Sequence, residues 1–284
     1  MRQENGEHIQ KHATVIGGNG FVGRALARKL IDTGWDVWVP EKNDPQLFLK
    51  NLGNVFYCAG LTADYLQRPF DTVEAHASLL NSIIHSAHYD KLLYLSSTRL
   101  YDGLSGPVTE ASDIVVNPNN PRNLYDISKL LGESVCLQSG RASVARLSCV
   151  YFNEQDNDGF LSALLQQVIN TKKKEIVIDS SPFYSRDYVH LDDVVDGLIS
   201  IMSGESGSIY NLASGENVTN EKIYSIIKSC TGVSILSTRN TKPQDSPLIN
   251  IEKMKGQFFW KPRTLLPTIE ALLTLRLEQI ENSK

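Results

Sequence analysis

Residues 13–31, ATVIGGNGFVGRALARKLI, carry the pattern from which the fold of this chain can be predicted. It opens with a short apolar run, Ala13 to Ile16, that ends at glycines, and such a run is typical of a buried strand. Apolar residues then recur at Val22, Leu26 and Leu30, the spacing of a helix that packs through one face. The stretch therefore predicts a strand, a glycine-rich turn and a helix, which together begin an α/β sheet.

The three spaced glycines of this turn have separate predicted roles. Gly17 permits the tight turn, Gly20 lets a pyrophosphate approach the backbone, and Gly23 lets the helix lie close to the sheet. The helix begins at Phe21 and Val22, where its N–H groups and positive dipole end would face the phosphates. The spacing is G-x-x-G-x-x-G instead of G-x-G-x-x-G, so a purely structural turn is the alternative interpretation.

Two further segments fit a dinucleotide. A predicted strand over 35–39 leads to Glu41, an acidic residue at the distance past the glycines where a ribose diol is held. Glu41 favours NAD because a carboxylate repels a 2′-phosphate, but Lys42 beside it would attract that phosphate and leaves NADP as the alternative. After the next predicted strand, the small residues Ala59 and Gly60 would let a cofactor come close, although a plain turn explains them as well.

Composition narrows the class of protein. The chain has 284 residues, of which 41% are hydrophobic and 21% are charged. This length and composition are typical of a globular protein with a substantial core. Its formal net charge of −4 argues against bulk attraction to nucleic acid or to an anionic membrane surface. No stretch approaches the roughly 20 apolar residues of a membrane-spanning helix. The widely spaced cysteines are predicted to be buried free thiols of a cytoplasmic protein: Cys58, Cys136, Cys149 and Cys230.

Strands and helices alternate along the first half of the chain, which predicts a doubly wound parallel sheet. We expect a flexible leader over 1–12 and a dinucleotide-binding domain over 13–150. Residues 151–284 are predicted to form mainly a substrate-binding lobe, from which some segments return to the first domain. Within that lobe a helix over 220–230 is predicted to be capped by Asn220.

The strongest chemical signal is Tyr125-x-x-x-Lys129 on a predicted helix over 124–137, combined with Ser97 at the end of a buried strand. Residues four apart share one helix face. A phenol titrates near 10, which is too high for a base at neutral pH, but an ammonium one turn away lowers its pKa. A serine hydroxyl at the strand end can bond the same substrate oxygen. The three groups could therefore move a proton on or off an alcohol while a hydride passes to or from a nicotinamide.

In these motifs the chain resembles an extended short-chain dehydrogenase/reductase of the NAD-dependent epimerase/dehydratase family, which acts on nucleotide sugars. The resemblance continues along most of the chain in the family's order, through residues 17–23, 96–101, 125–129, 146–151, 186–193, 210–213 and 260–262. It implies a Rossmann-type fold with a smaller C-terminal α/β lobe. It also implies a nucleotide-sugar substrate, a role in polysaccharide or glycoconjugate precursor synthesis, and a homodimer whose interface uses the helices over 72–87 and 124–137.

The resemblance also implies roles for single residues. Ser97 matches the catalytic hydroxyl, with Thr98 as a substrate-binding neighbour that could substitute for it. Tyr125 matches the acid/base, and Lys129 matches the residue that tunes it and holds the nicotinamide ribose. Arg186 matches the arginine that binds the nucleotide diphosphate, since a guanidinium fork suits phosphate oxygens; a salt bridge to the adjacent aspartate is the alternative.

Departures from the family pattern bear on the substrate. The third-strand region is short, and His76 stands where the family commonly has Asn; a solvated or core-satisfied histidine is expected there. Thr98 is followed by Arg99 and Leu100 instead of Asp-Glu, which argues against dehydration. Epimerisation with tightly held NAD is then favoured, and NAD(P)H-dependent reduction of a nucleotide 4-ketosugar is the alternative. A catalytically silent NAD(P)-binding sensor or scaffold is a third hypothesis, which the intact Ser, Tyr and Lys argue against.

Overall fold

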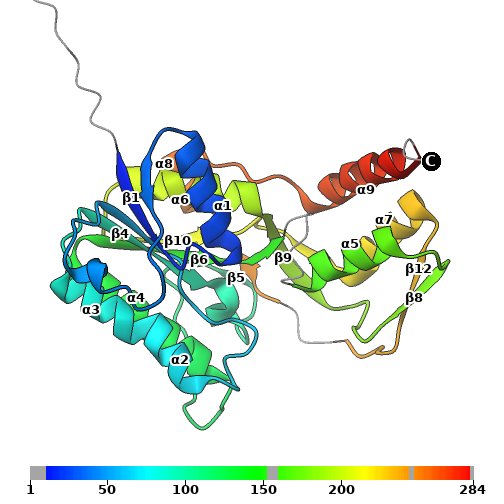
Figure 1. Cartoon of the computed structure of the whole chain (residues 1–284). Coiled ribbons are helices and arrows are strands. Elements are labelled where there is room, and N and C mark those ends of the chain that lie inside the picture. The colour runs from blue at the N-terminus through cyan, green and yellow to red at the C-terminus, as the bar shows by residue number, and fades with distance from the viewer. Residues whose placement is uncertain (1–10, 152–158, 243–245, 282–284) are drawn as a thin grey trace, which may run out of the picture. The chain divides into compact units, whose positions relative to one another are not determined.

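The protein is described by a computed structural model, which covers residues 11–151, 159–242 and 246–281 (Figure 1). The predicted leader therefore lies outside the described residues except for Lys11 and His12. The chain forms two compact units, each built from several segments. The first unit comprises the residues up to Leu95, Val116–Val144 and Ile201–Ser208; the second comprises Ser96–Val115, Ala145–Ser200 and the residues from Ile209 onward.

The central element is a six-stranded sheet of order β10-β6-β4-β3-β1-β2. Its strands in chain order are β1 (His12–Ile16), β2 (Asp36–Trp38), β3 (Asn54–Tyr57), β4 (Lys91–Ser97), β6 (Ala142–Leu147) and β10 (Ile209–Leu212). β1 pairs in parallel with β2 and with β3, and β3 pairs in parallel with β4. Val15, Phe56 and Leu93 are almost fully buried, as expected for strands covered on both faces. The predicted doubly wound parallel sheet is confirmed.

Helices of the first unit cover both faces of its strands. α1 (Phe21–Asp32) packs on β1 and β2, while α3 (Leu79–Ser86) and α4 (Asn123–Ser139) lie side by side on the other face (Figure 1). Between β2 and β3 the chain forms only the 3-10 turn η1 (Pro45–Phe48). This short turn explains why the third-strand region is shorter than the family pattern.

The predicted continuous helix over 72–87 is interrupted. It consists of α2 (Pro69–Val73), the π-helical turn η2 (Glu74–Ser78) and α3. A π-helical turn holds an extra residue, which shifts the helix face presented by the residues that follow. The hydrophobic spacing alone did not reveal this turn, because apolar positions continue on both sides of it.

The second unit holds the shorter sheets. β7 (Cys149–Tyr151) pairs in parallel with β9 (Ser185–His190), which pairs antiparallel with β11 (Asn217–Thr219). The remaining elements are η3 (Thr98–Tyr101), β5 (Pro107–Val108), α5 (Phe160–Asn170), β8 (Glu175–Ile178), α6 (Leu191–Ser203), α7 (Asn220–Thr231), β12 (Ser234–Ser237), β13 (Leu248–Ile249), α8 (Glu252–Phe258) and α9 (Leu265–Glu281). α5, α7 and α9 share one apolar core, which includes Leu165, Ile227 and Leu273.

Two local predictions were wrong. Thr219, not Asn220, caps α7: its side chain accepts the Lys222 N–H at 3.4 Å, while the Asn220 amide donates to the Ser181 carbonyl at 2.8 Å. The cysteines are all free, but only Cys136 is buried. Cys149, the first residue of β7, is exposed, and Cys58 and Cys230 are partly exposed.

Within the described ranges, none of the helices combines the length and apolar character needed to cross a bilayer.

Candidate functional site

The glycine turn after β1 is packed so tightly that three of its glycines leave no room for a side chain. Gly17 has φ +79°, and a Cβ there would stand 2.6 Å from the backbone N of Ala59. A Cβ on Gly18 would stand 2.6 Å from Val39 Cγ1, and one on Gly23 would collide with the Gly17 carbonyl oxygen. The turn therefore sits directly against the chain that follows β2 and β3.

The N-terminus of α1 is chemically suited to phosphate. Gly20 is its N-cap residue, no side chain of the described chain caps it, and its first turn contains no acidic residue. Its leading N–H groups thus keep the positive end of the helix available to an anion. The cradle that a Cβ would fill at Gly17 and Gly23, together with this helix end, fits the pyrophosphate of NAD(P).

The sheet also positions the other predicted cofactor contacts. Glu41 is exposed two residues past Val39, the side chain that touches Gly18. On the other side of the turn, Ala59 lies against Gly17, and the next residue, Gly60, faces two buried side chains. A Cβ on Gly60 would stand 3.3 Å from Lys129 Nζ. The glycine turn and Lys129 are thus linked through the short segment that follows β3.

The Tyr125 and Lys129 side chains lie inside the protein on α4. Tyr125 is 4% exposed and Lys129 is 5% exposed. Lys129 Nζ donates a hydrogen bond to the carbonyl oxygen of Leu95 at 2.8 Å and lies 4.8 Å from the centre of the Tyr94 ring. Burial lowers the pKa of Lys129 to about 7, and the charge of Glu133 partly opposes that shift.

The Tyr125 ring is held by aromatic neighbours that sequence reasoning did not assign to the site. Tyr65 meets it edge-on with ring centres 5.4 Å apart, and His76 meets it at 5.1 Å with the rings perpendicular. His76 Nδ1 lies 2.8 Å from the Ser128 hydroxyl, which donates to the Tyr125 carbonyl at 2.9 Å. In the sequence, the only indication that His76 belongs to the site was that it replaces the Asn common in the family. Of the two expectations for His76, solvated or hydrogen-bonded within the core, the structure shows the second.

Ser97 ends β4 and belongs, with Thr98, to the second unit. Its Oγ accepts the Arg99 N–H at 3.1 Å and so caps η3. A hydroxyl that accepts a hydrogen bond keeps its own proton to donate. β4 thus carries both the carbonyl that binds Lys129 and, two residues further on, the predicted catalytic hydroxyl.

Arg186 lies on β9 in the second unit and is 28% exposed. Its guanidinium donates to Ser246 Oγ at 3.0 Å, lies 4.4 Å from the Tyr184 ring centre, and is 3.7 Å from an Asp102 carboxylate oxygen. In the described part of the chain no salt bridge joins Arg186 to Asp187, the alternative named above. The Asp187 carboxylate accepts backbone N–H groups of residues 214–216. Arg186 is therefore held in place with part of its fork exposed.

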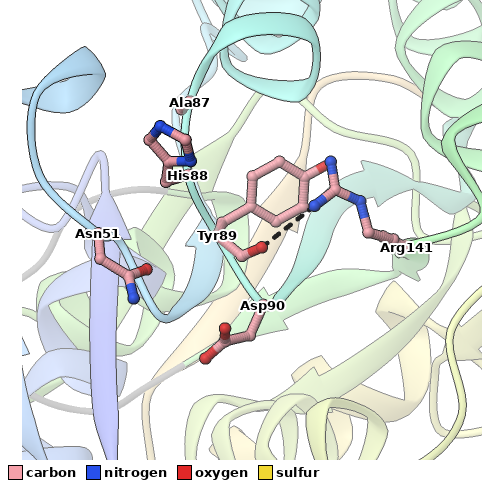
Figure 2. Close-up of a pocket in the computed structure, with 6 residues that line it drawn as sticks. All are labelled: Asn51, Ala87, His88, Tyr89, Asp90 and Arg141. Atoms are coloured by element: carbon pink, nitrogen blue, oxygen red, sulfur yellow. Dashed lines mark hydrogen bonds between the residues drawn. The ribbon is translucent and has the colours of Figure 1, made fainter.

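A pocket of about 430 Å³ lies elsewhere in the first unit (Figure 2). Arg141 donates to the Tyr89 carbonyl at 3.3 Å and stacks on the Tyr89 ring. The lining residues directly precede β3, β4 and β6: Asn51, Ala87, His88, Tyr89, Asp90 and Arg141. The pocket thus lies at the amino ends of the strands, whereas the glycine turn follows the carboxyl end of β1. The described residues also contain no group of His, Cys, Asp and Glu arranged to hold a metal ion.

A glycine-cradled helix end and a buried Tyr–Lys pair on a doubly wound parallel sheet define the class: a dinucleotide-binding protein of the short-chain dehydrogenase/reductase type. A sequence model of the NAD dependent epimerase/dehydratase family matches residues 13–213, and the chain belongs to that family.

Known relatives agree with this assignment. Putative GDP-L-fucose synthase 2 of Arabidopsis thaliana is 25% identical over 286 residues, covering 89% of this chain and 87% of the relative. GDP-6-deoxy-D-mannose reductase of Pseudomonas aeruginosa is 29% identical over 246 residues, covering 75% of this chain and 77% of the relative. The fold is similar to that of MoeE5 in complex with UDP-glucose and NAD, with a TM-score of 0.79, 20% identity, and 95% of this chain and 99% of that chain covered.

Proposed function

We propose that the protein is an NAD(P)-dependent nucleotide-sugar oxidoreductase that exchanges a hydride and a proton at one carbon of the sugar. The observation that carries the proposal is the buried Tyr125–Lys129 pair on α4, whose lysine Nζ lies beside Gly60. Because Gly60 has no side chain, a ribose or a nicotinamide ring can approach Lys129 closely.

The first unit supplies the proposed cofactor site. The backbone from Gly17 to Gly23 receives the pyrophosphate, with the Phe21 and Val22 N–H groups at the helix end. Glu41 accepts hydrogen bonds from the adenosine ribose. Ala59 and Gly60 border the nicotinamide half, and Lys129 donates to its ribose. When bound, NAD(P) supplies the hydride donor or acceptor.

Tyr125 is the proposed acid/base. Its hydroxyl gives a proton to the sugar oxygen when a ketone is reduced and takes the proton back when an alcohol is oxidised. The charged form of Lys129, one helical turn away, stabilises the phenolate. Ser97 donates a hydrogen bond to the same sugar oxygen, since its Oγ already accepts from Arg99.

The nucleotide part of the substrate is assigned to the second unit. Arg186 binds the diphosphate, with Thr98 near the sugar. The two named relatives support a nucleotide sugar, because one carries the name of a GDP-L-fucose synthase and the other that of a GDP-6-deoxy-D-mannose reductase. The sequence favours epimerisation, and reduction of a 4-ketosugar is the second candidate because the 29% identical relative is a reductase.

A panel of nucleotide sugars separates the candidates. The purified protein is mixed with UDP-, GDP-, dTDP- and CDP-linked sugars and their 4-keto forms, with and without NADH or NADPH. Interconversion without a net change in absorbance of the nicotinamide identifies an epimerase, whereas loss of reduced cofactor identifies a reductase. Tight NAD(P) binding without turnover of any sugar would favour the silent sensor or scaffold.

Tyr125→Phe tests the acid/base directly. We expect it to reduce kcat by about 10²–10⁴-fold, the usual contribution of a general acid/base, while the Kd of NAD(P) stays near wild type. Tyr89→Phe is the matched control, because Tyr89 is also a buried tyrosine of the first unit but lines the pocket at the amino ends of the strands. Equal activity of the Tyr125→Phe variant and the wild type would remove Tyr125 from the mechanism.

We also propose a homodimer that pairs α3 and α4 of two copies. Leu131 on α4 is 52% exposed and Phe70 on α2 is 89% exposed, so apolar side chains face outward on this layer of the first unit. The proposed location is the cytoplasm, which the free cysteines support because free thiols are typical of reducing compartments.

A further inference from the structure

His76 is a fully buried imidazole placed between the two parts of the proposed site in the first unit. On one side its Nε2 accepts the backbone N–H of Leu61 at 3.2 Å, and a Cβ on Gly60 would stand at the same distance from it. On the other side its Nδ1 lies 2.8 Å from the Ser128 hydroxyl, on the catalytic helix between Tyr125 and Lys129.

These hydrogen bonds leave one tautomer. The Leu61 N–H is a donor, so Nε2 has no proton. The Ser128 hydroxyl donates its own proton to the Tyr125 carbonyl at 2.9 Å, so the Nδ1–H must donate to Ser128. His76 is thus neutral and joins the segment after β3 to α4 through a directed chain of hydrogen bonds. Burial and the nearby charge of Lys129 agree with this, since both lower the pKa of His76, to about 2.

The backbone around His76 is built to hold it there. The residue lies in the π-helical turn η2, and two buried tyrosines of the sheet donate to carbonyls of that turn. Tyr57 bonds the Ala75 carbonyl at 2.7 Å, and Tyr94 bonds the His76 carbonyl at 3.0 Å. Gly132 on α4 makes the close approach possible, since a Cβ there would stand 2.7 Å from the His76 carbonyl oxygen. π-helical turns inside α-helices are frequent at functional sites.

We propose that His76 is a positioning residue that couples the cofactor-facing segment Gly60–Leu61 to the catalytic helix α4. Its Nε2 fixes the loop that borders the nicotinamide ribose, and its Nδ1–H fixes the turn of α4 that presents Tyr125. The inference rests on the proposed function in so far as it assigns that loop to NAD(P).

Two amide variants separate the two halves of this role. The side-chain amide of Asn reaches the place of Nδ1 but not that of Nε2, whereas that of Gln reaches the place of Nε2. Both variants lose the ring contact with Tyr125, so they are compared with each other. We expect the Kd of NADH to be about tenfold higher for His76→Asn than for His76→Gln, because the Leu61 N–H is left without its acceptor. We expect kcat to be about tenfold lower for His76→Gln than for His76→Asn, because the hydrogen bond to Ser128 is lost, with the Kd of NADH near wild type. His88→Asn, at an exposed histidine just before β4, is the control.

The inference is tested by whether the two variants affect different quantities, the Kd of NADH in one and kcat in the other. Equal losses of affinity and kcat in both variants, or no loss in either, would show that His76 only fills space. The tautomer is read separately from the ¹⁵N-coupled NMR spectrum of the wild-type histidines, where a proton on Nε2 of His76 would overturn the inference and a proton on Nδ1 supports it. A wild-type protein that binds neither NADH nor NADPH would refute the proposed function, and the NMR measurement would still decide the hydrogen-bond chain.

Discussion

The buried Lys129 gives a testable link between the site and the stability of the protein. Burial lowers its pKa from 10.5 to about 7 in the folded protein. Between these values the unfolded chain binds more protons than the folded protein does, so the lysine makes the free energy of unfolding rise with pH. Lys129→Met removes this titration and keeps an unbranched chain of similar length.

The expected magnitude follows from the two pKa values. Each pKa unit corresponds to about 1.36 kcal/mol, and the folded-state lysine is about half protonated at pH 7. From pH 7 to pH 9 its contribution therefore rises by about 2 kcal/mol, with most of the change above pH 7.5. The side chain is 5% exposed, so solvent screening does not reduce this value substantially.

The assay is urea denaturation of the cofactor-free protein at pH 7, 8 and 9, followed by circular dichroism and by tryptophan fluorescence. The measured quantity is the difference in the free energy of unfolding between wild type and Lys129→Met at each pH. Lys222→Met makes the same substitution at an exposed position of α7 and is the matched control. A pH-independent difference for Lys129→Met would mean that Lys129 is charged inside the folded protein, and the reasoning from burial would fail.

Other predictions concern single positions. Gly23→Ala should lower the free energy of unfolding by about 1–3 kcal/mol and abolish NAD(P) binding, since its methyl group collides with the Gly17 carbonyl; thermal melting and NADH titration measure the two effects. Gly256→Ala should stabilise the protein by about 0.5–1 kcal/mol, because it lies in α8 with open space around the added methyl group. Leu131→Glu should convert the proposed dimer to a monomer in light scattering, and a wild type that is already monomeric would refute the dimer. Ser97→Ala should reduce kcat by about 10²-fold in the nucleotide-sugar assay without changing the Kd of NAD(P).

Much of the first unit could be predicted from the sequence because the evidence is local. The glycine turn could be predicted from a short apolar run, three glycines and the helical spacing of the residues that follow. The structure gives Gly17 a positive φ and leaves no room for a side chain at Gly23, which are the conditions that selected glycine. Tyr125 and Lys129 were expected on one helix face because residues four apart in any α-helix are neighbours.

Features that depend on distant residues could not be predicted in this way. The π-helical turn η2 is stabilised by hydroxyls from β3 and β4, and nothing in the spacing of residues 72–87 indicates those donors. Thr219 and Asn220 are both good helix caps, and the choice between them was decided by the contact of Asn220 with Ser181.

The parallel α/β sheet, the glycine cradle and the spacing of the Tyr–Lys pair could be predicted from local residue patterns. The chemical state of the site depends on the assembled fold. The pKa of Lys129 is lowered because segments far away in the chain exclude water from it, and the tautomer of His76 is set by donors on a loop and on a helix. Burial and hydrogen-bond direction depend on which elements meet in space, and local residue patterns do not specify that meeting.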